Sequence, residues 1–271
     1  MIKIFGGLFL FFLASSVNAQ LVNIESQRMQ TDNVRFVLKS DFLFNYSNND
    51  GIYIYRFDIG LATQYKFKNM NNTVFFIGNY GLIRSEGLDY QNSWFLHLRY
   101  NRKLGQNKRF RLESFIQDQS NELLSINSRN LIGLGLRYKF VKGDYFHAYV
   151  GNSYMYEKEV SEIVDQKYYN HRNNTYLSLT LRLPKSGLEL LNTVYFQPLY
   201  TDISNFRILE QFKAEMPLFG NLRVSALFNY FYNNLNPLGT SEFTSNMSVG
   251  LTYQIEASPP KQKYIPAYKM Y

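Results

Sequence analysis

Alternation between apolar and polar side chains is the feature that most constrains the fold of this chain. From Ile132 to Phe140 every second residue is apolar or aromatic. These residues are Ile132, Leu134, Leu136, Tyr138 and Phe140. A repeat of two places them on one face of a β-strand, whereas an amphipathic helix needs apolar residues at intervals of three and four. The run therefore predicts a strand with one apolar face.

About twelve runs of this kind follow one another along the chain. They begin near Val34, Ile52, Thr73, Ser93, Lys108, Ser128, Asp144, Asn174, Gly187, Ile203, Asn221 and Phe243. No stretch after residue 20 is apolar for the roughly 20 residues that a membrane-spanning helix needs. The sequence therefore predicts an all-β fold in a single domain.

The connections between the runs alternate in length. Short turns are predicted at 68–71, 105–107, 141–143, 184–186 and 217–220, and longer polar links at 85–91, 120–127, 158–171, 199–202 and 234–242. Only the first link of the second kind, 47–51, is shorter than this pattern predicts. Short periplasmic turns and longer external loops are typical of outer-membrane barrels. We therefore expect a transmembrane antiparallel up-and-down β-barrel of about 12 strands, without a plug domain.

The N-terminus has the layout of a secretory signal peptide. Lys3 is followed by an apolar run over 4–14 and by a small-residue exit at Ala19, which predicts cleavage after Ala19. We expect a signal peptide at 1–19, a periplasmic segment at 20–33, the barrel at 34–255 and a proline-containing periplasmic tail at 256–271. Both termini would then be periplasmic, in the cell envelope of a Gram-negative organism.

Composition agrees with a barrel and excludes several classes of site. The 271 residues include 23 Tyr and 23 Phe but no Cys, so disulfides and thiolate chemistry are excluded. The formal net charge is +8, yet the bases are spread along the strands rather than clustered, and an exported chain does not meet nucleic acid. We predict no nucleic-acid partner and no cofactor.

The last strand carries a candidate assembly signal. Gly250, Tyr253 and Ile255 fit a pattern of glycine, two free positions, an aromatic, one free position and an apolar residue. This resembles the terminal-strand signal that the outer-membrane barrel insertion machinery reads. The predicted partners are therefore outer-membrane lipid and that machinery during assembly. The link 158–171 and the tail 256–271 are candidate contacts for a further envelope protein.

Charged residues fall on the less apolar face of the runs. Those predicted to face the lumen are Arg56, Asp58, Arg99, Arg111, Glu113, Arg137, Arg182, Lys213, Glu215 and Arg223. An Arg or Lys facing lipid near the bilayer centre would cost about 2–4 kcal/mol, so this consistent placement also indicates a barrel. Two interpretations stay open: a basic lumen that favours anions, and a lumen packed with arginine–carboxylate pairs. Glu210 departs from the pattern, since it lies between Ile208 and Phe212, and indicates either the membrane rim or a β-bulge.

No catalytic or metal site is predicted. His97, His147 and His171 have no metal-pair spacing between them. His147 is followed by Ala148 and Tyr149, which does not reproduce the His-x-Ser pattern of the outer-membrane phospholipases. Gly133-x-Gly135 lacks the third glycine and the helix of a dinucleotide loop, and is expected to relieve crowding in the barrel wall.

Three stretches of sequence resemble a known family. They are 21–28, then 111–119 (RLESFIQDQ) and 129–138 (RNLIGLGLRY). Together they resemble the salt-induced outer-membrane protein family, a domain of unknown function. The resemblance implies an outer-membrane β-barrel and no established activity. The Gly-rich first strand of that family is missing, because 34–46 is apolar and aromatic here.

The leading hypothesis is a non-enzymatic, porin-like outer-membrane barrel, either a narrow channel for small anionic solutes or a structural envelope protein. One alternative is a barrel enzyme of lipase or protease type. Another is an accessory subunit of an envelope complex.

Overall fold

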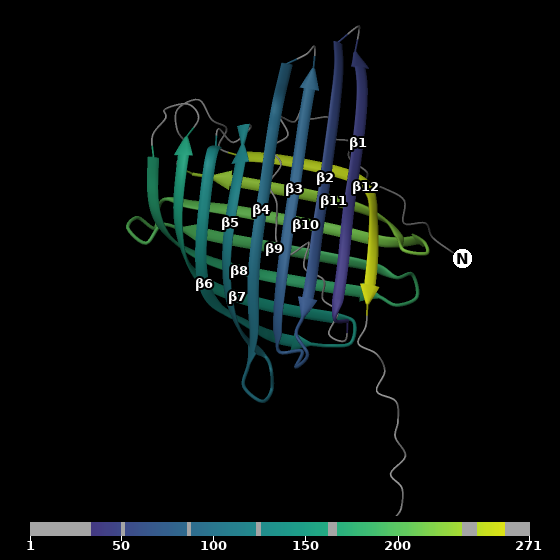
Figure 1. Ribbon diagram of the computed structural model, residues 1–271. Coiled ribbons are helices and arrows are strands. Elements are labelled where there is room, and N and C mark those ends of the chain that lie inside the picture. The colour runs from purple at the N-terminus through teal and green to yellow at the C-terminus, as the bar shows by residue number, and fades with distance from the viewer. Residues whose placement is uncertain are drawn as a thin grey trace, which may run out of the picture.

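The computed structural model describes residues 34–49, 52–85, 88–122, 126–161, 167–234 and 243–257. Within them the chain forms twelve strands, which close into one antiparallel barrel in which each strand pairs with its neighbours in sequence and β1 pairs with β12 (Figure 1). The strands are β1 (Phe36–Asn49), β2 (Ile52–Lys66), β3 (Asn72–Ser85), β4 (Leu88–Leu104), β5 (Phe110–Asn121), β6 (Ile126–Lys142), β7 (Phe146–Ser161), β8 (Lys167–Leu183), β9 (Leu188–Pro198), β10 (Phe206–Phe219), β11 (Leu222–Asn233) and β12 (Phe243–Ala257). The predicted fold class and strand number are confirmed. Among the described residues, no helix is long and apolar enough to cross a bilayer.

The strands are strongly tilted. In Figure 1, β1 to β6 rise along the near wall, while β9 to β12 cross behind them at a steep angle. Such a tilt is required when a sheet closes on itself with staggered strands. Phe36 pairs with Ala257, so the described start of β1 and the end of β12 lie at the same end of the barrel.

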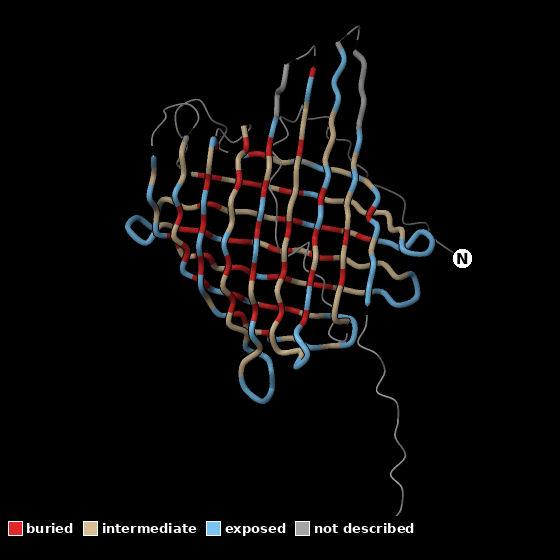
Figure 2. The backbone as a smooth tube through the Cα atoms, viewed as in Figure 1, coloured by how far each residue is buried: buried red, intermediate tan, exposed pale blue. Residues whose placement is uncertain are grey.

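The two faces of the wall differ in the way that the alternation predicts. Ile132, Leu134 and Leu136 are more than half exposed on the outer face of β6, whereas Arg137 is 1% exposed on its inner face. Buried and exposed residues alternate in this way along the strands of the near wall (Figure 2). Apolar groups point outward and charged groups inward, which is the reverse of a soluble barrel and typical of a membrane barrel.

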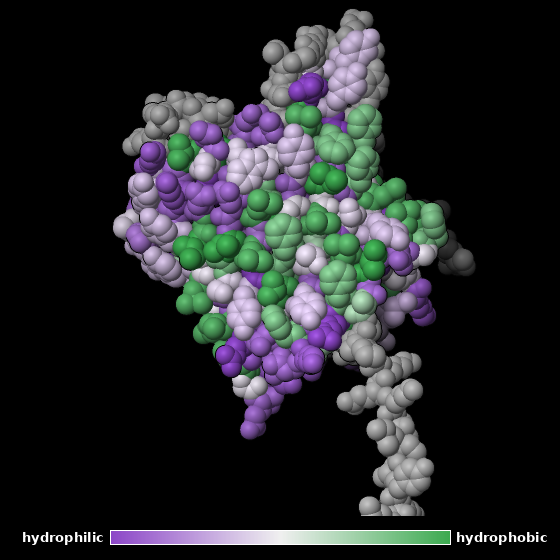
Figure 3. Space-filling view, in the orientation of Figure 1, coloured by the Kyte–Doolittle hydropathy of each residue, from purple (hydrophilic) through white to green (hydrophobic). Residues whose placement is uncertain are grey.

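The apolar outer wall is interrupted on one side. Asn152 on β7 donates hydrogen bonds to Thr175 Oγ1 (2.7 Å) and Asn173 Oδ1 (3.1 Å) on β8, and Asn173 donates to the hydroxyl of Tyr200 (3.2 Å). We call Asn152, Asn173, Thr175 and Tyr200 the polar flank. In Figure 3, hydrophilic side chains gather at the upper left, while apolar side chains cover the middle of the view.

Glu210 also lies on the outer face, where it accepts a hydrogen bond from Asn192 Nδ2 (2.8 Å). The register of β10 is uninterrupted at Glu210, and its shift lies between Pro217 and Phe219. Of the two explanations offered for Glu210, the β-bulge is therefore wrong, and the membrane rim stays a prediction.

The pairing between β1 and β12, which we call the seam, is incomplete. It runs from Phe36–Ala257 to Phe42–Leu251. The pairing of β1 with β2 continues to Asn49–Ile52, and that of β12 with β11 reaches Phe243. Among the described residues, therefore, the remainder of β1 and of β12 is paired on one side only.

Several predicted boundaries are wrong. β7 ends at Ser161 and β8 begins at Lys167, so most of the predicted link 158–171 is strand. β4 begins at Leu88 rather than near Ser93, which removes most of the link 85–91. β10 begins at Phe206, so the connection after β9 is longer than the predicted 199–202. Polar residues were interpreted as loop, but the inner face of a membrane barrel is itself polar, so polarity does not mark the end of a strand.

The predicted tail starts too early, because β12 includes Glu256 and Ala257. The predicted signal peptide, the periplasmic segment 20–33 and the rest of the tail lie outside the described residues.

Candidate functional site

Alternation places all ten predicted lumen residues on the inner face of the barrel. Most of them fall into two networks of ion pairs. Arg56 and Asp58 form a separate pair on β2, with 2.7 Å between Nε and Oδ2. Arg182 pairs with Glu189 (3.2 Å) at the end of β8, where both side chains are partly exposed. The lumen is therefore lined by paired charges rather than by isolated bases.

The first network surrounds Glu113 on β5. Its carboxylate lies 3.4 Å from Arg99 Nη1 on β4 and 3.7 Å from Arg137 Nη1 on β6. Tyr176 on β8 donates a hydrogen bond of 2.6 Å to the same carboxylate. Because β6 and β7 lie between β5 and β8 in the sheet, this contact spans two strands on the inner face. Arg137 also stacks over the ring of Tyr149, 3.8 Å from its centroid, and Arg111 lies 5.9 Å from the same centroid.

The aromatic groups of this network fit against glycine. A β-carbon on Gly151 would lie 2.2 Å from the ring of Tyr176, and one on Gly133 would lie 2.2 Å from the ring of Phe115. Register pairs each ring with the glycine on the next strand. The expected relief of crowding at Gly133 thus has a specific cause, since these glycines let aromatic rings lie flat against the inner wall.

The second network surrounds Glu215 on β10. Lys213 Nζ lies 2.6 Å from one carboxylate oxygen, and Lys39 Nζ on β1 donates to the other at 2.7 Å. Arg223 Nε on β11 lies 3.6 Å away, and Lys213 also approaches Asp41 at 3.7 Å. Lys39 reaches Glu215 past the two intervening strands, β11 and β12. This network therefore links β10, near the end of the chain, to the first strand, β1.

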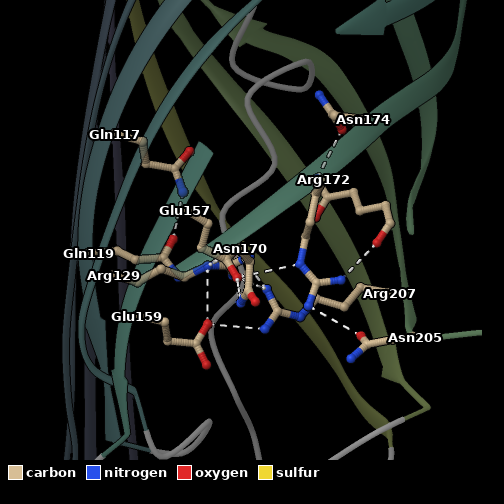
Figure 4. Close-up of polar contacts among 11 residues, drawn as sticks. Gln117, Gln119, Arg129, Glu157, Glu159, Asn170, Arg172, Asn174, Asn205 and Arg207 are labelled. Atoms are coloured by element: carbon tan, nitrogen blue, oxygen red, sulfur yellow. Dashed lines mark hydrogen bonds and ion pairs between the residues drawn. The ribbon is translucent and has the colours of Figure 1, made fainter. Parts of the chain in front are cut away.

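A third group was not predicted, and its central carboxylate is completely buried. We call Arg129, Glu157, Glu159, Arg172 and Arg207 the Glu157 cluster (Figure 4). Glu157 on β7 has no exposed surface. Its carboxylate forms ion pairs with Arg129 of β6, Arg172 of β8 (3.4 Å) and Arg207 of β10 (2.8 Å). Glu159 accepts a second bond from Arg207 (3.0 Å). Three guanidinium groups thus face two carboxylates, so the cluster carries a formal charge of 3 − 2 = +1.

Neutral groups complete this cluster. Asn170 donates to Glu157 (3.0 Å), while Arg172 donates to the backbone oxygen of Gln197 (3.1 Å) and to Asn205 Oδ1 (3.3 Å). Charge-assisted bonds of this kind are about twice as strong as neutral ones. The arrangement holds four strands together and leaves an excess of positive charge inside the lumen.

The Glu157 cluster was missed in part because the end of β7 and the start of β8 were interpreted as a loop. Glu157 and Arg172 lie at or beside the ends of the predicted link 158–171. The signal that could have located them is the alternation of Ser153, Met155 and Glu157 against Tyr154 and Tyr156. It continues the pattern of β7 without interruption.

The three histidines do not form one site. His97 lies inside the barrel between the rings of Phe95 and Phe115 and accepts a hydrogen bond from Arg99 Nε (3.3 Å). His171 lies on the outer face, with its ring centroid 5.8 Å from that of Tyr154. His147 pairs in register with Thr180 near the other end of β7.

The candidate assembly-signal residues lie on β12. Tyr253 and Ile255 are exposed on its outer face, and Gly250 lies on its inner face beside β1. Recognition of these residues by the insertion machinery stays a prediction.

Comparisons with known proteins agree with the fold. The COG4313 outer membrane channel from Pseudomonas putida F1 is similar in structure, with a TM-score of 0.52, 8% identity, and coverage of 88% of this chain and 100% of that chain. The translocator domain of the autotransporter NalP from Neisseria meningitidis has a TM-score of 0.48, with 12% identity and coverage of 84% and 91%. No curated protein sequence matches this chain.

The sequence itself matches one family. Residues 54–255, which extend from β2 to β12, match DUF481, a family described as proteins of unknown function. The chain therefore belongs to the DUF481 family.

Proposed function

We propose that this protein is a non-enzymatic barrel of the Gram-negative outer membrane that passes small anions through a narrow lumen. The observation that carries the proposal is the Glu157 cluster, in which three arginines exceed two carboxylates inside the barrel. A fixed positive charge in a low-dielectric passage raises the local concentration of anions and repels cations.

The location follows from the outer wall and the N-terminus. The outward apolar side chains suit lipid, and the predicted signal peptide would export the chain with both termini periplasmic. On this proposal, outer-membrane lipid contacts the wall, and the barrel insertion machinery reads Gly250, Tyr253 and Ile255 during assembly. The resemblance to salt-induced outer-membrane proteins fits this location.

The other networks extend the positive lining. Glu113 is opposed by Arg99 and Arg137, and Glu215 is opposed by Lys39, Lys213 and Arg223. In each group the bases outnumber the carboxylates that they contact. A small anion moving along the lumen would therefore exchange one set of basic groups for another.

Ion selectivity in planar bilayers tests the proposal. The refolded protein should conduct in a KCl gradient with a reversal potential that indicates chloride preference. Arg207→Gln lowers the formal charge of the cluster from +1 to 0 and should move the reversal potential toward zero. Arg102→Gln makes the same charge change at an exposed site on the outer face of β4 and should leave it unchanged. A wild-type channel that prefers potassium would refute the proposal.

A structural envelope barrel is the second candidate, and the contacts between non-adjacent strands favour it. Tyr176 bonds Glu113 from β8 to β5, and Arg207 bonds Glu157 from β10 to β7. These ties join strands that are not neighbours and would stiffen the wall from inside. Absence of discrete conductance in the wild type and in Arg207→Gln, with both correctly folded, would select this candidate.

A further inference from the structure

The seam between β1 and β12 leaves long edges unpaired on both strands, whereas in the β8–β9 pair only β8 continues well beyond the ladder. Beyond Phe42–Leu251 no register pair joins the two strands among the described residues. Residues 43–49 of β1 continue beside β2, and residues 243–250 of β12 continue beside β11. The wall is therefore open on one side over about half the length of both strands.

Unpaired strand edges cannot face hydrocarbon without cost. Each unsatisfied backbone N–H or C=O in a bilayer costs several kcal/mol, and exposed edges bind whatever can complete them. The open part of the seam must therefore hold water or a ligand with polar groups. Outside it lie exposed apolar side chains on both strands, among them Phe42, Phe44, Met247, Val249 and Leu251.

A cavity of about 80 Å³ lies at this opening. On the seam side its lining includes Phe42 and Leu251, the last register pair between β1 and β12, and Leu43 and Gly250 just beyond it. Its inner lining reaches across the barrel to Gln211 and Lys213 on β10 and to Leu227 on β11. The cavity therefore lies in the polar interior, directly beside Leu43 and Gly250, where the pairing of the seam stops.

The inner lining is polar but balanced in charge. Arg56 pairs with Asp58, and Lys213 lies near Asp41, so two bases and two acids contribute a net charge of 2 − 2 = 0. Gln211 is 2% exposed, and its side-chain oxygen has no hydrogen-bond partner among the described residues. This lining suits a head group that donates hydrogen bonds and carries no net charge.

We propose that the open seam is a lateral binding site for an amphiphile with one hydrocarbon chain and a polar head of no net charge. The chain lies against Phe42 and Leu251 in the bilayer, and the head enters the cavity toward Gln211 and Lys213. The proposal rests on the membrane location proposed above but does not require the anion channel. It assigns to the wall a route that is separate from the axis of the barrel.

The geometry of Gly250 provides a way to close this route. A β-carbon on Gly250 would lie 3.6 Å from Cβ of Leu43, which is within the range found in disulfides. The chain has no other Cys, so Leu43→Cys with Gly250→Cys can be oxidised to tie the strands at the first unpaired position. Ser40→Cys with Tyr253→Cys, a register pair in the closed part of the seam, is the matched control.

The probe is a single-chain phosphoethanolamine, whose ammonium group donates hydrogen bonds, with a photoreactive diazirine beside its head group, in bilayer nanodiscs. Wild type should give adducts on the lumen-facing residues Leu227 and Asn229, which a lipid outside the wall cannot reach. Oxidation of the Leu43/Gly250 pair should lower these adducts at least tenfold, and reduction should restore them. The oxidised Ser40/Tyr253 control should label like wild type. Adducts confined to the outer face, or lumen labelling that the Leu43/Gly250 disulfide does not change, would overturn the proposal.

A second variant keeps the proposal testable if the disulfide barrel does not fold. Ser248→Phe places a ring into the cavity from β12, whereas Ser245→Phe on the same strand places it on the outer face. Ser248→Phe should abolish labelling of Leu227 and Ser245→Phe should not. Equal labelling in both variants would count against the site.

Chloride conductance, measured on the same variants, separates this proposal from the proposed function. Labelling without conductance would support the seam site and refute only the channel.

Discussion

The β6–β8 wall and the β1–β12 seam show two ways of completing the same barrel. β7 is paired with β6 from Ser161 to His147 and with β8 from Val160 to Phe146, and the Glu157 cluster binds this wall to β10 from inside. At the seam, pairing stops at Phe42–Leu251. The comparison indicates that closure needs only part of the last strand pair when side-chain networks hold the remaining wall in shape.

The difference also separates two roles. In the β6–β8 wall nearly every buried charge has a partner of opposite sign, which fixes one arrangement of strands. At the seam, unpaired backbone and a small cavity leave room for a ligand. The following changes to the chain should break or sharpen this contrast.

The largest effect is expected from Glu157→Gln. Removing this carboxylate leaves Arg129, Arg172 and Arg207 close together, and loss of one partner of a buried ion pair typically costs about 3–5 kcal/mol. Urea unfolding of the refolded barrel in detergent, followed by tryptophan fluorescence and gel mobility, measures the loss. Glu159→Gln, which removes a more exposed carboxylate with fewer partners, should cost clearly less. Equal losses would show that Glu157 does not hold the wall.

A second effect is expected from Gly133→Val. The new β-carbon would collide with the ring of Phe115 at 2.2 Å, and overpacking of this kind costs about 1–3 kcal/mol. Gly78→Ala is the control, because a β-carbon there meets only ordinary contacts at 3.5 Å or more. Adding Phe115→Ala to Gly133→Val should recover part of the stability. Additive losses in the double variant would argue against the clash.

Hydrogen exchange should show the contrast directly. Half of the backbone amides of a strand point to each neighbour, so about half of those in 43–49 have no partner on β12. They should exchange much faster than amides of 36–42 on the same strand. Uniform protection along β1 would mean that the seam is closed in solution. Oxidation of the Leu43/Gly250 cysteine pair should slow exchange in the first part of 43–49.

The smallest effect is expected from Glu189→Gln at the barrel end. Its partner Arg182 and Glu189 itself are partly exposed, and such surface pairs contribute about 0–1 kcal/mol. Glu189→Gln should therefore change the free energy of unfolding by less than about 1 kcal/mol. A loss as large as that of Glu157→Gln would mean that position within the barrel does not set the contribution of an ion pair.

The strand number, the barrel and the facing of the charges were accessible from sequence because each strand keeps one apolar face. Arg99, Glu113 and Arg137 lie in runs with clear alternation, so their common face was predictable. Their meeting around Glu113 was not predictable. Alternation shows which face of the sheet a residue lies on, but it does not show the level of that residue along the axis of a tilted barrel.

The Glu157 cluster escaped prediction for a different physical reason. Near the start of β8 both faces are polar, because Asn170 and Arg172 face the lumen while His171 and Asn173 face outward. Alternation of hydropathy then disappears in β8 although the strand continues. The incomplete pairing at the seam was also not predictable from the sequence, because pairing between the first and last strands depends on the stagger of all the strands between them.

The polar flank has a consequence for the surrounding lipid. On β1 and β2, exposed apolar side chains such as Phe42, Phe44, Tyr55 and Ile59 extend well up the wall, whereas Asn152, Asn173 and Thr175 interrupt the apolar surface of β7 and β8. A bilayer adapts to a shorter apolar span by thinning locally. In the proposed outer membrane, the hydrocarbon layer should therefore be thinner beside the polar flank than beside the seam, so that the barrel deforms its membrane unevenly around its circumference.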